Sequence, residues 1–264
     1  MNLRFNWTRI AQCVLALAGV LALKLHYSTA SADQLRWILA PTAALVELVS
    51  GASFEFESRA GYISRERGFL IANSCAGVNF LIAAFLTLSM RKLLGDRSKG
   101  GVWGFLPIAA LIAYLATLVA NTARITIALL MRQSHAEIGL ESGPWSGPWS
   151  GPWSGWMNPD QLHRFEGVFI YFGFLLLLFV VSEKMSAEKS SYPFRRLLLP
   201  LLVYYAIALG LPLLNGAYRQ GADFWRHALF VLLIPLLLTL SSLIFRSVVQ
   251  WFWRKPDNYG QSPA

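Results

Sequence analysis

Long uninterrupted apolar runs divide this chain and limit what it can fold into. Three of the clearest are Phe165 to Ser182, Leu197 to Leu214 and His227 to Ile244. Each is close to the roughly 20 residues that a helix needs to cross the hydrocarbon core of a bilayer. The chain is 55% hydrophobic and only 14% charged, whereas soluble domains carry roughly 25% charged residues. Too little polar surface is left for a soluble domain, so the runs predict membrane-spanning helices.

The pattern predicts an all-α membrane protein, a polytopic helical bundle that forms one integral membrane domain over residues 1–264. Six spans are predicted, at about 10–25, 70–90, 103–123, 165–182, 197–214 and 227–246. The first span resembles a secretory signal peptide, because small residues that could form a cleavage site follow it. The further spans favour an uncleaved first helix.

Basic residues concentrate in two short loops between the predicted spans. These residues are Arg91, Lys92, Arg97 and Lys99 in one loop, and Lys184, Lys189, Arg195 and Arg196 in the other. The positive-inside rule places such loops in the cytoplasm, which makes 26–69 and 132–162 the outer loops. The net charge of +9 is explained by these membrane-flanking positions, and nucleic acid is not expected as a partner.

The first outer loop contains a short apolar segment, Trp37 to Val49, of about 13 residues. As a helix it would be about 20 Å long, too short for a core of roughly 30 Å. We therefore expect it to lie at the interface or to be half-inserted. Phe54 to Arg67 then alternates apolar and polar residues around Arg59-Ala60-Gly61, which predicts an exposed hairpin.

The second outer loop carries three tandem Gly-Pro-Trp-Ser copies, from Gly143 to Ser154. Glycine and proline at this frequency exclude a helix or strand interior, and tryptophan favours the boundary between membrane and water. Turns lying on the headgroups are one interpretation. An aromatic lip beside a substrate groove is the other.

Cys75 lies in Ala72-Asn73-Ser74-Cys75-Ala76-Gly77, where Asn73 or Ser74 could cap a helix that runs to Met90. A cysteine in the first turn of a helix is close to unpaired N–H groups and to the positive end of the dipole, which favour the reactive thiolate. This setting suits a nucleophile. The alternative is a small buried residue that packs beside Gly77. Cys13 has no comparable setting.

Arg124 lies near the outer end of the third apolar run, within Asn121-Thr122-Ala123-Arg124-Ile125. A charged side chain at membrane depth costs at least about 2.5 kcal/mol on insertion scales, so it normally has a partner or a task. Asn121 shares its helix face at i, i+3 spacing. The alternative is that Arg124 reaches the headgroups.

His163 follows Asn158-Pro159-Asp160-Gln161, which is typical of a helix start, with an N-cap and a proline at the first helical position. Gly167 lies one turn further along the same face. Imidazole titrates near neutrality and can take a proton from a thiol or pair with a thiolate. An ordinary interfacial histidine is the alternative; His26, His135 and His227 lack such a setting.

The topology brings Cys75, Arg124 and His163 to the same side of the membrane. A nucleophile, a cation that stabilises an oxyanion, and a general base or acid are together the parts needed for acyl transfer. The sequence contains no metal-ligand cluster, P-loop or nucleotide fingerprint, so no metal and no cofactor is expected.

Cys75-Ala76-Gly77, Asn121-Thr122-Ala123-Arg124-Ile125, and His163 with Gly167 resemble, in this order, the motifs of the exosortase/archaeosortase family, and within it the exosortase K branch. The resemblance covers about residues 65–182. Many members of that family read Cys-Ser-Gly where this chain has Cys75-Ala76-Gly77, so one hydroxyl beside the nucleophile is missing. The Gly-Pro-Trp-Ser copies are not a family feature either.

The resemblance implies a membrane cysteine protease and transpeptidase in the bacterial cytoplasmic (inner) membrane, with its active site on the outer side. Its substrates would be secreted proteins that end in a short motif, a transmembrane helix and a basic tail. Cys75 would attack at the motif and form a thioester, Arg124 would stabilise the oxyanion or thiolate, and His163 would move the proton. Membrane lipids would surround the site. A small polytopic transporter and a non-catalytic membrane assembly factor are the alternative functions.

Overall fold

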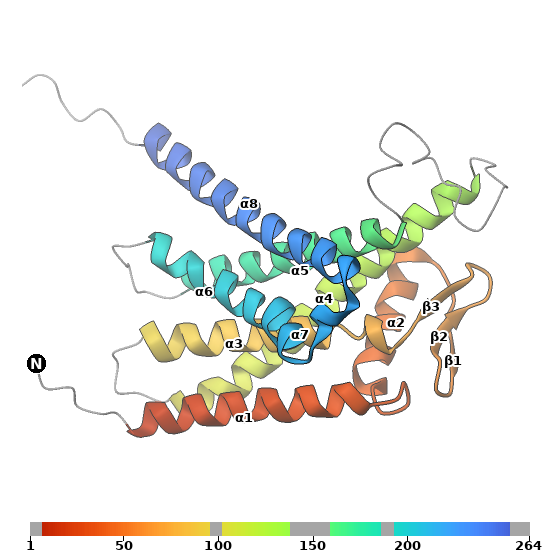
Figure 1. Ribbon diagram of the computed structural model, residues 1–264, viewed down its shortest axis with the longest axis horizontal. Helices are drawn as coiled ribbons and strands as arrows, with labels where there is room; N and C mark the ends of the chain where they lie inside the picture. The colour runs from red at the N-terminus through yellow and green to blue at the C-terminus, as the bar shows by residue number, and fades with distance from the viewer. Residues whose placement is uncertain (1–6, 96–101, 138–158, 186–192, 254–264) are drawn as a thin grey trace, which may run out of the picture.

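The computed structural model describes residues 7–95, 102–137, 159–185 and 193–253, and Figure 1 shows their arrangement. Helices dominate, with the bounds α1 Trp7–Thr29, α2 Arg36–Ser50, α3 Val78–Gly95, α4 Val102–Glu137, α5 Pro159–Lys184, α6 Pro193–Tyr205, α7 Leu211–Leu214 and α8 Ala222–Trp253. A π-helical turn, Ala206–Gly210, joins α6 to α7, and a 3-10 turn, Ala217–Gln220, precedes α8.

Six helical segments in the described part of the chain are long and apolar enough to cross a membrane. They are Trp7–Thr29, Asn73–Leu93, Gly104–Met131, Phe165–Lys184, Leu197–Leu214 and Phe224–Phe245. The predicted all-α polytopic fold is therefore confirmed. The largest difference concerns the third span, predicted to end at 123, because α4 continues unbroken to Glu137. Arg124 therefore lies inside a long helix.

Helix α3 is at the centre of the bundle. It contacts α1, α4, α5 and α6. In its span, 67% of the most apolar 18-residue stretch is buried, against 11% of the corresponding stretch of α1. Helices α1 and α3 run antiparallel, because Lys24 Nζ donates to Asn79 Oδ1 over 2.8 Å at one end and Arg9 donates to the Leu93 carbonyl at the other. The end of α1 that carries Thr29 thus lies beside the start of α3.

Helix α2 corresponds to the short segment predicted at Trp37 to Val49. Its 15 residues give a length of about 22 Å, and it is not among the six helices that could span a membrane. One face is buried and contacts α4, where Tyr114 donates to the Trp37 carbonyl over 2.8 Å and the two rings stack. Its depth in the membrane remains a prediction.

A small antiparallel sheet of three strands lies with α2 at one end of the bundle, as Figure 1 shows. The strands are β1 Glu55–Glu57, β2 Gly61–Ser64 and β3 Phe69–Ile71. The predicted hairpin around Arg59-Ala60-Gly61 is confirmed, with Phe56 opposite Tyr62. Strand β3 was not predicted, because Phe69-Leu70-Ile71 is continuous with the apolar run of the next helix.

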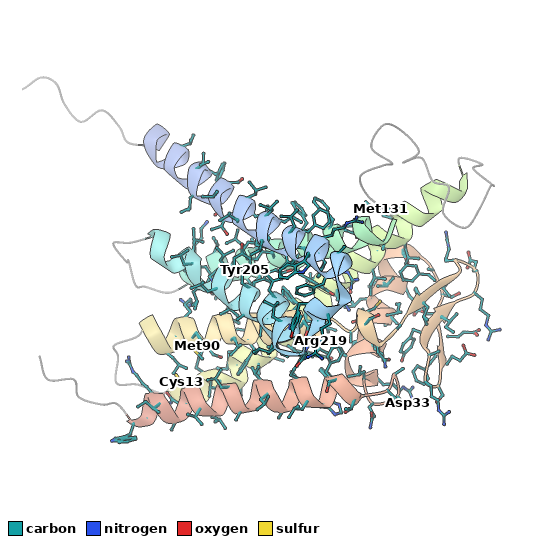
Figure 2. The ribbon with its side chains drawn as sticks, in the orientation of Figure 1. Cys13, Asp33, Met90, Met131, Tyr205 and Arg219 are labelled. Carbon is teal, nitrogen blue, oxygen red and sulfur yellow. The ribbon has the colours of Figure 1, made fainter. Side chains whose placement is uncertain are left out.

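Asp33 holds the turn of this hairpin, and Figure 2 shows it at the sheet end of the molecule. Its carboxylate accepts hydrogen bonds from the Arg59 N–H at 3.0 Å and from the Ser58 hydroxyl at 3.1 Å. The Arg59 N–H above all keeps the pKa of Asp33 below its ordinary value. The contact also secures Arg59 in a left-handed conformation, with φ 68°, that a residue with a side chain rarely adopts.

Candidate active site

Cys75 lies between the sheet and the central helix. Strand β3 ends at Ile71, Ala72 is extended, and Asn73–Cys75 form a 3-10 turn in which the Cys75 N–H donates to the Ala72 carbonyl over 2.8 Å. The prediction that Asn73 or Ser74 caps a helix containing Cys75 is wrong. No side chain caps this turn and α3 begins only at Val78. Cys75 therefore precedes the first turn of α3.

Gly77 makes this junction possible. Its φ of +69° is one that glycine adopts without strain, and its carbonyl accepts the first helical hydrogen bonds, from Phe80 and Leu81. A Cβ here would also lie 3.2 Å from Thr117 Cγ2 and 3.3 Å from Asn121 Cγ. The missing side chain thus allows α4 to approach the Cys75 turn closely.

The end of α1 holds the same turn from the other direction. Asn73 Nδ2 donates to the Ala30 carbonyl over 3.0 Å, and the Tyr27 hydroxyl donates to the Asn73 carbonyl over 3.4 Å. The Cys75 residue itself is half-buried. The turn that carries the thiol is therefore fixed on two sides while the cysteine keeps part of its surface accessible.

A continuous chain of hydrogen bonds joins the Cys75 backbone to Arg124. Asn121 is fully buried, and its Nδ2 donates to the Cys75 carbonyl over 2.5 Å. The Tyr171 hydroxyl donates to Asn121 Oδ1 over 2.8 Å and accepts from Arg124 Nη1 over 3.2 Å. The predicted shared face of Asn121 and Arg124 is confirmed, since both contact the same tyrosine of α5.

Arg124 is held inside the bundle. Its guanidinium lies 5.4 Å from the centre of the Tyr171 ring, and the Glu166 carboxylate is within range of electrostatic interaction with it. Glu166 is a buried carboxylate, 8% exposed. These partners satisfy the requirement that a charge at membrane depth be compensated. They disfavour the alternative in which Arg124 extends to the headgroups.

Gly167 provides the space that Arg124 occupies. A Cβ at this position would lie 3.3 Å from Arg124 Nε, which is tighter than ordinary van der Waals contact. A Cβ at this position would require the guanidinium, or the helix that carries it, to move by a few tenths of an ångström. The glycine predicted as a supporting residue is therefore in contact with the predicted cation.

His163 is placed only by its backbone. Helix α5 begins at Pro159 as predicted, which puts His163 in its second turn, but the side chain lies outside the described residues. His163, Gly167 and Tyr171 follow one another at four-residue spacing and so share a face. At Gly167 and Tyr171 this face contacts Arg124. The Gly-Pro-Trp-Ser copies also lie outside the described residues.

The structure adds three side chains that the sequence did not single out, namely Tyr27, Glu166 and Tyr171. Glu166 had a recognisable signal, because it is the single charged residue within the predicted span 165–182, and such residues are functional candidates. Tyr171 and Tyr27 had none, since a tyrosine in an apolar helix is ordinary.

The fold and this cluster define a polytopic membrane protein in which hydrogen bonds through Asn121 and Tyr171 link the backbone of a cysteine to a half-buried arginine. Among the residues that the structure describes, no group of three histidine, cysteine or acidic side chains could hold a metal ion. No protein-family model, no curated protein and no solved structure matches the chain.

Proposed function

We propose that this chain is a membrane-embedded cysteine transpeptidase that removes the C-terminal sorting signal of secreted proteins. The observation that carries the proposal is the hydrogen-bonded chain from the Cys75 backbone through Asn121 and Tyr171 to Arg124. A half-buried thiol and a half-buried cation, next to a backbone turn that is held by hydrogen bonds, suit acyl transfer to a cysteine. The resemblance to exosortases and archaeosortases supports the same conclusion.

In the proposed reaction, the Cys75 thiol passes its proton to His163, and the resulting thiolate attacks the carbonyl of a peptide bond at the sorting motif. The tetrahedral intermediate collapses, the C–N bond breaks, and the tail leaves as an amine that takes a proton from His163. An acceptor nucleophile then gives its proton to His163 and attacks the remaining thioester. The C–S bond breaks, and Cys75 Sγ takes the proton back to become a thiol. Arg124 stabilises the thiolate and the developing oxyanion, because its charge acts in a low-dielectric environment.

The proposed setting is the bacterial cytoplasmic membrane, with the Cys75 end of the bundle facing outward. The basic loops next to the predicted spans support this orientation. A substrate anchored by its own transmembrane helix would be confined to the same bilayer, so its motif would be presented at high effective concentration to Cys75. The membrane would thus contribute to catalysis by positioning the substrate.

Comparison of host cells with and without this gene tests the proposal. With the chain present, at least one secreted protein is expected to lose a C-terminal helix and basic tail. Without it, the full-length precursor should accumulate in the membrane fraction. Mass spectrometry of C-terminal peptides from both strains measures the difference. Identical C-termini in the two strains would contradict the proposal, whereas a change in solute uptake alone would favour a transporter.

A further inference from the structure

Tyr171 contacts both Asn121 and Arg124 through hydrogen bonds. Its hydroxyl donates its single proton to Asn121 Oδ1, so it is left to accept from Arg124 Nη1. Because Asn121 Oδ1 is bound in this way, the amide must turn its Nδ2 towards the Cys75 carbonyl. One hydroxyl thereby sets the orientation of groups on both sides of the site.

The tyrosine ring packs against two neighbours. It stacks on Phe80 of α3 with ring centres 5.3 Å apart, and the Arg124 guanidinium lies 5.4 Å from its centre. Tyr171 thus joins α3, α4 and α5 at the level of the Cys75 turn. Packing of this kind restricts the rotamers of the ring and so keeps its hydroxyl in one position.

We propose that Tyr171 is a positioning residue, which sets the distance between the Arg124 charge and the Cys75 thiol by holding Arg124 and Asn121 in one hydrogen-bonded chain. The hydrogen bonds from Arg124 through Tyr171 to Asn121 would then serve catalysis, so this proposal rests on the proposed function. Tyr171 does not touch the substrate; it acts through its two neighbours. Its effect should therefore be visible in the reactivity of the resting thiol, before any substrate binds.

The test measures the rate at which iodoacetamide alkylates Cys75 in the purified, full-length Cys13→Ala protein over a range of pH. Tyr171→Phe keeps the ring and both of its packing contacts but removes the hydroxyl. We expect the alkylation rate near neutral pH to fall about fivefold, the size of one intramolecular hydrogen bond. The pH profile should move to higher pH, because the thiolate loses stabilisation by a well-placed cation.

Asn121→Ala interrupts the chain from its other side and should give a fall of similar size. Combining it with Tyr171→Phe should add little, as expected for residues that act as one unit. Tyr205→Phe is the matched control, since Tyr205 also donates to a neighbouring helix, at the Leu232 carbonyl over 2.6 Å, but lies outside the site. This control should leave the profile unchanged.

An unchanged alkylation profile in folded Tyr171→Phe would overturn the proposal, and so would fully additive effects of Tyr171→Phe and Asn121→Ala. Thermal unfolding of each variant identifies any that fail to fold, in which case the Asn121→Ala profile decides. Failure of the proposed function would appear differently, as normal tail processing by a Cys75 variant. The alkylation profile needs no substrate, so the two failures are distinguishable.

Discussion

Replacing Cys75 with alanine is expected to abolish removal of the C-terminal tail completely. In a cell that lacks the wild-type gene, the Cys75→Ala protein should leave the substrate as unprocessed as it is in a cell without the gene, because the thioester cannot form without the sulfur. Stability should change little, since alanine is small and the turn is held by backbone and Asn73 contacts. The abundance of the precursor with its tail attached, measured by mass spectrometry, checks the prediction.

Cys13→Ala is the matched control, because it removes the other cysteine of the chain. Cys13 lies on α1, about 21 Å along the helix from Tyr27, and Figure 2 shows it near Met90, away from the sheet end. This variant should process its substrate at the wild-type rate. Normal processing by Cys75→Ala would exclude the transpeptidase, while transport or a docking function would remain compatible with that result.

Replacing Arg124 with alanine is expected to lower the rate of processing by about 100-fold or more, the usual cost of removing a group that stabilises transition-state charge. The change also leaves the Glu166 carboxylate buried without the nearby positive charge and removes a hydrogen bond to Tyr171. Some loss of stability should therefore accompany the loss of rate. Processing rates and thermal midpoints must be measured on the same preparations.

Arg124→Lys separates these two effects, because it keeps the charge but loses the planar guanidinium that reaches Tyr171. It should retain most of the stability and recover only part of the rate. Arg36→Ala is the control, since Arg36 also lies over an aromatic ring, 4.4 Å from the centre of Phe56, but on the surface of α2. Wild-type processing by Arg124→Ala would contradict the assigned role.

The spans and much of the site could be predicted because they depend on local signals. Long apolar runs define the spans whatever their partners, and the i, i+3 spacing of Asn121 and Arg124 fixes their common face. Gly77 and Gly167 could be singled out as well, because they belong to the sequence motifs that contain Cys75 and His163. What these residues contact was not predictable in the same way.

The start of α3 and the role of Tyr171 required the structure. Phe69-Leu70-Ile71 is as apolar as a helix segment, and periodicity cannot separate a strand of three residues from the helix that follows. Only pairing with β2 makes it a strand. The partners of Tyr171 are likewise distant in the chain, 50 residues away at Asn121 and 47 at Arg124, so no local pattern marks it.

Direct detection of a thioester on Cys75 is the most direct test of the central claim. Wild-type protein mixed with its tail-bearing substrate, in the absence of an acceptor, is denatured rapidly, digested and analysed by mass spectrometry. The account predicts that the Cys75 peptide carries the C-terminal residues of the shortened substrate, and that hydroxylamine releases them as a hydroxamate. Tail removal without an adduct on Cys75, or with an adduct on a different residue, would contradict it.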